Sequence, residues 1–138
     1  MDCFDADVVI YAAVPGHALG RRVFALLSAG SAGEPAGAGS VLLLPEVLAK
    51  PLRDGATDER QVLAGLLAKL DLRPVDQSTA ELATVLAGRY RLRAADAVHL
   101  ATAVGIGADR FITNNARDFA KTIVEVDIVY PADLPDPG

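Results

Sequence analysis

Short β-rich runs alternate with amphipathic helical stretches along this chain. That order predicts an α/β domain, because strands that are separated by helices pair in parallel and form one central sheet. We therefore expect a mainly parallel sheet between helices. The expected strands are a first one that ends near Asp5, followed by residues 41–44, 72–75, 110–113 and 123–129.

The segments between these strands have apolar residues at helical spacing. Residues 8–11 fit either a strand, because Val8, Val9 and Ile10 are β-branched, or the start of a helix. Ser78 and Glu81 have the spacing of a capping box, which predicts a helix start at that point. The expected helices cover about residues 19–28, a segment that begins near Pro45, and residues 57–70, 78–86 and 93–104.

The length of 138 residues fits a single domain with one core, which we expect to span 1–138. Residues 30–40 are rich in Gly and Ala without periodicity and predict a surface loop. Residues 131–138 form a Pro- and Asp-containing tail. Neither segment reads as a linker between two domains.

Composition excludes several classes of protein. A chain that is 51% hydrophobic is not disordered, and one cysteine with two histidines cannot build a structural zinc site or an internal disulfide. The lone cysteine fits a reducing environment, so we expect a cytoplasmic protein, and no apolar run is long enough to span a bilayer. The net charge of -5 argues against a general nucleic-acid coat, but it permits a local site that binds phosphate through metal ions.

Three acidic residues occupy positions that an ordinary core would not favour. Asp5 and Glu46 each follow an apolar run, and Asp96 lies within an apolar helix. Ligands of open α/β sheets gather outside the carboxyl ends of the strands, so these carboxylates can converge. Crowded carboxylates require protons or cations, and oxygen-only ligands favour Mg²⁺ or Mn²⁺.

Each of these acids also has a purely structural interpretation. Asp5 has the position of a helix N-cap, and Glu46 is placed to complement the positive end of a helix dipole. Asp96 either pairs with Arg93, three residues earlier, or faces a polar cleft. The sequence leaves these alternatives open.

Other polar residues near the expected strand ends have similar ambiguities. Asp7 forms a DxD with Asp5 or caps a turn, and the Thr113 to Asn115 segment offers hydrogen-bonding groups or forms a plain Asn turn. Asp118 is a further acidic candidate. The remaining candidates are Arg89, Arg91 and Arg93 as phosphate contacts or a solvated helix end, His99 as a packed histidine and Cys3 as a core residue of the first strand.

Four short segments of the chain follow one another in an order that is typical of a known family. They are FDADVVIY at 4–11, LPEVL at 44–48, LRAADAVHLATA at 92–103, and FITNN at 111–115 followed by DF at 118–119. In this order they resemble the PIN-domain ribonucleases, and among them the VapC-like toxins of bacterial toxin-antitoxin pairs. The resemblance covers nearly the whole chain, and its most specific part is the segment 92–103.

The resemblance implies a three-layer α/β/α sandwich with a metal site at the end of its sheet. Asp5, Glu46 and Asp96 would be the acidic ligands of Mg²⁺ or Mn²⁺, and Asn115 stands where many relatives carry a fourth acid. Asp7 stands where the family often has Asn or Ser. The implied activity is RNA hydrolysis that leaves a 5′-phosphate and a 3′-hydroxyl, by a homodimer that a cognate VapB-like antitoxin blocks.

Two other functions have to be compared with this one. A haloacid-dehalogenase-like phosphatase also places a DxD after its first strand, but it requires a lysine and further acids after a threonine motif, and little chain follows Thr113. A catalytically silent PIN-fold module would bind RNA or a protein without cleavage. Asn115 keeps this second alternative open, because it carries no charge.

Overall fold

A computed structural model describes residues 1–138, and its five strands form a single parallel sheet in the order β3-β2-β1-β4-β5. This confirms the α/β class and the parallel pairing expected from the alternating sequence. The strands are β1 (Asp2–Phe4), β2 (Gly37–Ser40), β3 (Leu70–Arg73), β4 (Arg110–Ile112) and β5 (Asp127–Val129).

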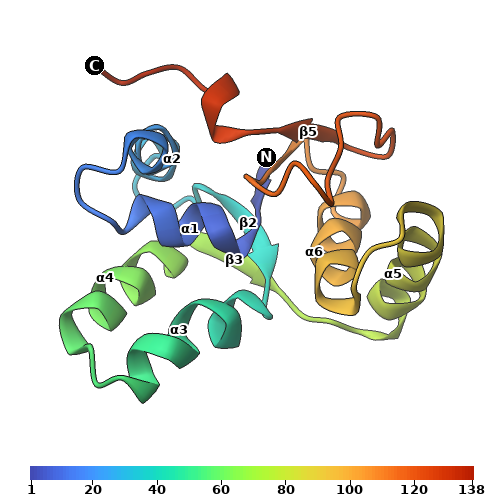
Figure 1. Cartoon of the computed structure of the whole chain (residues 1–138), viewed down its shortest axis with the longest axis horizontal. Helices are drawn as coiled ribbons and strands as arrows, with labels where there is room; N and C mark the ends of the chain where they lie inside the picture. Colours follow the sequence, from blue (N-terminus) through green and yellow to red (C-terminus); the bar gives the residue numbers. More distant parts are fainter.

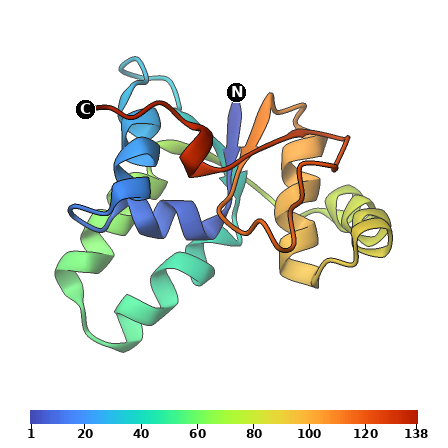
Figure 2. The ribbon, with the colours of Figure 1, turned by 45° about the horizontal axis from the view of Figure 1, so that its top comes forward.

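Helices cover both faces of the sheet, with α1 to α4 on one side and α5 and α6 on the other (Figure 1, Figure 2). None of them is long and apolar enough to cross a membrane. The helices are α1 (Ala6–Ala12), α2 (Ala18–Ser28), α3 (Leu43–Arg53), α4 (Thr57–Leu67), α5 (Gln77–Tyr90) and α6 (Ala94–Gly105), and the 3-10 turn η1 (Pro131–Asp133) follows β5.

Alternating side chains of the strands separate the core into two halves. Phe4 and Ile112 pack with the apolar residues of α1 to α4, whereas their neighbours Cys3 and Phe111 pack with those of α5 and α6. Successive residues of a strand point to opposite faces, so two-residue apolar runs suffice to fill both layers. Cys3 is fully buried in this core, as the sequence predicts.

The second strand differs from its sequence prediction. Residues 41–44 were expected as the strand, but β2 consists of Gly37–Ser40, inside the segment expected to be a surface loop. A Cβ on Gly37 would lie 2.6 Å from the Phe4 ring and 2.7 Å from the backbone oxygen of Asp2. The strand therefore needs small residues because β1 and its side chains approach so closely. Only residues 30–35 of the expected loop lie on the surface as a group.

Three smaller differences concern element ends. β3 begins at Leu70, before the expected 72–75, and β5 contains only Asp127–Val129 of the expected 123–129. The open segment 8–11 belongs to helix α1. Helix α5 begins at Gln77 with Asp76 as its cap, whose carboxylate accepts the Thr79 N–H at 2.9 Å, so the predicted capping box at Ser78 is wrong.

The chain direction brings the carboxyl ends of β1, β2 and β4 to one edge of the sheet. From β1 the sheet extends through β2 to β3 on one side and through β4 to β5 on the other. The chain thus switches between layers at β1, the kind of position at which open α/β sheets bind their ligands. Asp5 directly follows β1, and Thr113 directly follows β4.

Candidate active site

Asp5 lies at the junction between β1 and helix α1, and its two carboxylate oxygens have different partners. One oxygen accepts the N–H of Ala6 at 2.8 Å, which makes Asp5 the N-cap of α1. The other accepts the hydroxyl of Thr113 at 2.8 Å from the end of β4. Burial raises the pKa of Asp5, although both hydrogen bonds oppose that shift. The capping interpretation is therefore correct, but it accounts for only one of the two oxygens.

The turn after β4 is organised by a reciprocal pair. The Asn115 side chain donates to Asp118 Oδ2 at 2.9 Å, and the Asp118 N–H donates to Asn115 Oδ1 at 3.2 Å. The Asn115 N–H also donates to the Thr113 hydroxyl at 3.1 Å. The Asn115 amide thus fixes the turn that holds Thr113 and Asp118, and both ends of that amide are occupied.

Asp7 faces the same turn from the first turn of α1. Its Oδ2 accepts the N–H of Asn114 at 3.1 Å, while its Oδ1 is buried without a hydrogen-bond partner. Burial, together with the nearby Asp5, raises the pKa of Asp7 to about 7. A buried carboxylate oxygen without a hydrogen-bond partner lowers the stability of the fold. Asp7 is therefore a stronger candidate for a role in the site than the sequence indicated.

Glu46 approaches from α3, which lies in the same helical layer as α1. It lies in the first turn of α3, where it complements the helix dipole as its structural interpretation requires, and its side chain remains 35% exposed. Its Oε1 lies 3.1 Å from Nε2 of His99 on α6. Glu46 therefore reaches across from α3 to α6 and does not simply extend into solvent.

Asp96 lies in the first turn of α6 and makes no hydrogen bond or ion pair within the protein. The alternative in which it pairs with Arg93 is not what the structure contains, because Arg93 is exposed and has no ion-pair partner. Burial raises the pKa of Asp96, and the charges of Asp5 and then Asp118 raise it further. Asp96 thus faces the other acids.

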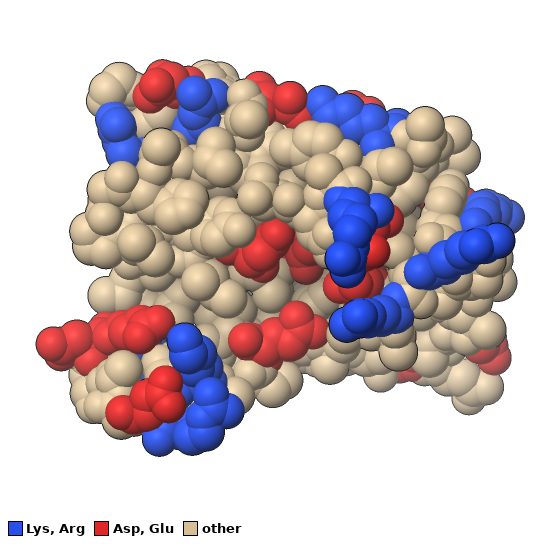
Figure 3. All heavy atoms as spheres, viewed as in Figure 1, with Lys and Arg blue, Asp and Glu red and all other residues tan.

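These effects tie the three sequence-predicted acids to one site. Asp5 acts on the pKa of Asp96, and Glu46 acts on the pKa of both. Acidic side chains lie near the middle of this face of the molecule, and Lys and Arg side chains lie beside them toward α6 (Figure 3). Asp7 and Asp118 are weaker candidates in the sequence, because their positions depend on how α1 and the turn after β4 fold together.

The donor set suits a hard divalent cation. The side chains that face the site carry mainly carboxylate oxygens, and the unpartnered Oδ1 of Asp7 and both oxygens of Asp96 are not used by the protein. No three His, Cys, Asp or Glu side chains are near enough to one another to ligate an ion together. A cation here would be held by one or two carboxylates and by water, which is usual for Mg²⁺.

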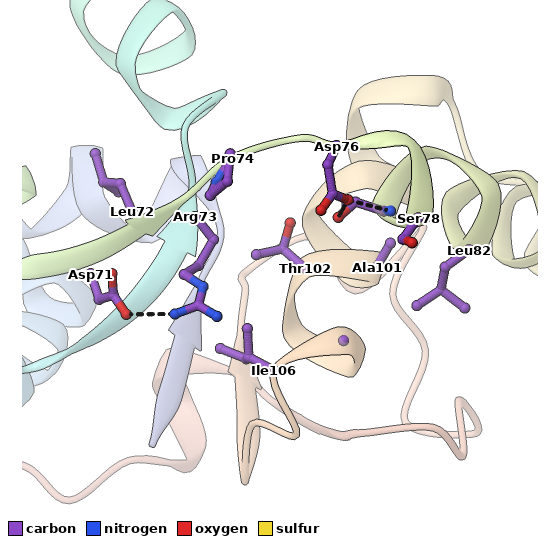
Figure 4. Close-up of a pocket in the computed structure, with 12 residues that line it drawn as sticks. Asp71, Leu72, Arg73, Pro74, Asp76, Ser78, Leu82, Ala101, Thr102 and Ile106 are labelled. Carbon is purple, nitrogen blue, oxygen red and sulfur yellow. Dashed lines mark hydrogen bonds and ion pairs between the residues drawn. The ribbon is translucent and has the colours of Figure 1, made fainter.

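A cavity of about 430 Å³ lies elsewhere, between the end of β3, the start of α5 and the C-terminal half of α6 (Figure 4). Asp71 and Arg73 form an ion pair there, and Thr102 of α6 contributes to its lining. The charges of this cavity are therefore largely paired within the protein. Its lining does not include Asp5, Asp7, Glu46, Asp96 or Asp118.

Comparison with known proteins identifies the family of this chain. The family model of the PIN domain matches residues 3–124. A chain of the solved structure "Toxin-antitoxin complex from Klebsiella pneumoniae" is 26% identical, with a TM-score of 0.75 over 95% of this chain and 98% of that one. No curated protein matches the sequence. Because the family model spans most of the chain, and the parallel α/β fold is consistent with it, this chain belongs to the PIN domain family.

Proposed function

We propose that this protein is a metal-dependent ribonuclease and the toxin of a toxin-antitoxin pair. The observation that carries the proposal is the convergence of Asp5, Glu46 and Asp96, from three distant segments, at one edge of the sheet. PIN domains are generally nucleases, and the similar solved structure is a toxin-antitoxin complex. The phosphatase alternative requires a catalytic lysine after Thr113. Lys121, the lysine in that part of the chain, forms an ion pair with Asp133 in the C-terminal segment.

The proposed chemistry assigns separate tasks to the acidic residues. Asp5 and Asp96 would hold Mg²⁺ or Mn²⁺, with Glu46 acting directly or through water. When bound, the ion supplies an activated water and stabilises charge on the scissile phosphate. The bond from phosphorus to the 3′ oxygen breaks, and that oxygen takes up a proton. Thr113 orients Asp5 through its hydroxyl.

Asn115 has a positioning task in this proposal. Its amide nitrogen and its amide oxygen each bond Asp118, and its backbone N–H bonds Thr113, so Asn115 fixes the turn that presents Thr113 and Asp118 to the site. An amide in this place adds no negative charge beside Asp5 and Asp96. We therefore infer that Asn115 supports the site through the turn and does not itself ligate the ion.

RNA is the proposed substrate, and basic residues beside the site can hold its backbone. Arg89 pairs with Glu125, but Arg91 and Arg93 are exposed and have no ion-pair partner. Both precede helix α6, which carries Asp96. Free guanidinium groups bind phosphate oxygens without reading sequence, so these two arginines would position the strand next to the acids.

The proposed partners are a VapB-like antitoxin and a second copy of the chain. Several large apolar side chains remain exposed around a cavity of about 530 Å³ between α1, α2 and α4, among them Val14, Phe24 and Val62. Contiguous exposed apolar surface is typical of protein interfaces. We assign this surface to the antitoxin, and we expect the protein alone to be a homodimer in solution.

A catalytically silent module is the second candidate. It is favoured by the neutral Asn115 and by the absence of three ligating side chains in contact with one another. Such a module would keep the fold and its partner surface and would leave RNA intact.

The test incubates the protein with labelled cellular RNA in Mg²⁺, in Mn²⁺ and in EDTA, and maps the new ends. We compare the parent with Asp96→Asn and with Glu59→Gln, which removes an exposed carboxylate on α4. The proposal predicts cleavage by the parent and the control only, abolished by EDTA, with 5′-phosphate ends. An Asp96→Asn variant as active as the parent would contradict it, and intact RNA under every condition would favour the silent module.

A further inference from the structure

We propose that His99 is a positioning residue that holds the Glu46 carboxylate in place for cation binding. This inference rests on the proposed function, because it concerns one of its metal-binding acids. It assigns a task to a histidine that the sequence alone treats as a packed core residue.

The contact between the two residues is the only side-chain hydrogen bond that joins α3 to α6. His99 is 1% exposed, so its ring cannot swing out to solvent, and its Nε2 lies 3.1 Å from Glu46 Oε1. His99 follows Asp96 by three residues on the same helix face. The ring therefore fixes Glu46 relative to the helix that carries another proposed ligand.

Glu46 depends on this contact because it has no other. Its carboxylate accepts no second hydrogen bond from the protein, and a free glutamate side chain moves among many rotamers. The imidazole engages Oε1 and leaves Oε2 available. A carboxylate that is held through Oε1 and keeps Oε2 free can contact a cation directly or through a water molecule.

The other ring nitrogen argues against a purely structural histidine. Nδ1 is buried and has no hydrogen-bond partner, so the ring needs its hydrogen on Nε2, the atom that faces Glu46. An apolar side chain would fill the same space without an unsatisfied polar atom. A leucine would pack at this position as well as His99 does. The one polar contact of His99 is with Glu46.

The variants His99→Gln and His99→Leu separate the effect of the hydrogen-bond donor at Nε2 from the effect of the side-chain volume. The glutamine amide can donate from about the position of Nε2, whereas leucine fills the space without a donor. Thr102→Val on the same helix is the control, because Thr102 is buried but lies toward the C-terminal end of α6, where it lines the cavity described above and donates its hydroxyl to the Val98 carbonyl (Figure 4). Circular dichroism confirms that each variant is folded.

Mn²⁺ affinity is the readout, measured from the EPR signal of free Mn²⁺ without RNA. We expect His99→Leu to weaken binding by about tenfold or more, as is typical for residues that orient metal ligands. His99→Gln should remain within about threefold of the parent, and Thr102→Val should match it. Equal affinity of His99→Leu and the parent would overturn the proposal, as would a parent that binds no Mn²⁺ or a folded His99→Gln as weak as His99→Leu.

A double variant tests whether the effect passes through Glu46. In a Glu46→Gln background, His99→Leu should cause little further loss of Mn²⁺ affinity, because the positioned carboxylate is already gone. A full additional loss would overturn the proposal. If the parent binds Mn²⁺ and the variants behave as expected but RNA stays intact, the ribonuclease assignment fails while the role of His99 stands.

Discussion

Replacing Asp7 with asparagine should stabilise the metal-free protein at alkaline pH. The native side chain is mostly buried, has one unpartnered oxygen and lies near Asp5. Its pKa is raised from the ordinary 3.8 to about 7. The native state thus keeps a proton that the unfolded chain releases between these two values, so the stability contributed by this group falls as pH rises from about 4 to 7 and stays low above that range.

The magnitude follows from the difference between the two pKa values. At pH 8 that difference corresponds to roughly 4 kcal/mol of destabilisation, and at pH 5 to roughly 1.5 kcal/mol. Asp7→Asn removes the charge and can still accept the Asn114 N–H. We therefore expect the variant to exceed the parent in free energy of unfolding by about 2 to 4 kcal/mol at pH 8 and by much less at pH 5.

Urea unfolding in EDTA at both pH values measures this difference, with Glu59→Gln as an exposed control that should change stability by less than about 0.5 kcal/mol. Comparing variant with parent at each pH removes the contributions of the other acids. A gain of the same size at pH 5 and pH 8 would refute the reasoning, because it could not arise from the titration of Asp7. A variant less stable than the parent at pH 8 would refute it as well.

Three further predictions concern β2, the Asp5 hydrogen bond and the arginines. Gly37→Ala should lower the free energy of unfolding by more than about 2 kcal/mol in a thermal or urea melt, because its Cβ would lie 2.7 Å from a backbone oxygen of β1. Thr113→Val should cost about 1 to 3 kcal/mol of stability and reduce RNA cleavage, since Asp5 loses a buried donor; unchanged cleavage would contradict the role of Thr113. Arg91→Gln with Arg93→Gln should raise KM for RNA several-fold, leave kcat within about twofold and flatten the salt dependence of binding. An unaltered KM would remove both arginines from the substrate path.

The fold was largely predictable because the alternation of strands and helices is a local property of the sequence. The prediction was wrong at β2, where apolarity was used as the sign of a buried strand. In this fold the strand next to β1 requires residues without large side chains, because a Cβ at Gly37 would meet Phe4 and a Cβ at Gly39 would meet Leu43. Such a constraint comes from the neighbouring strand and cannot be read from the segment itself.

The candidate site also contains residues that the sequence identified and residues whose importance only the packing shows. Asp5, Glu46 and Asp96 were named from their positions after apolar segments, and the structure places them within electrostatic reach of one another. Their ligand roles stay a prediction. Asp7 and His99 were ambiguous in the sequence because their importance depends on which atoms stay unpartnered after packing, namely Asp7 Oδ1 and His99 Nδ1.

Hydrogen bonding divides the acids into those that the protein has already satisfied and those left for a ligand. Asp5 accepts from two donors, one on each oxygen, so its orientation is fixed before anything binds. Glu46 has one donor and Asp7 has one, whereas Asp96 has none. The acids at the strand end are thus anchored, and Asp96 at the start of α6 keeps both oxygens free. The raised pKa of Asp96 comes first from burial and then from its acidic neighbours, and only His99 acts in the opposite direction. A cation would therefore relieve at this residue a repulsion that no hydrogen bond of the protein offsets.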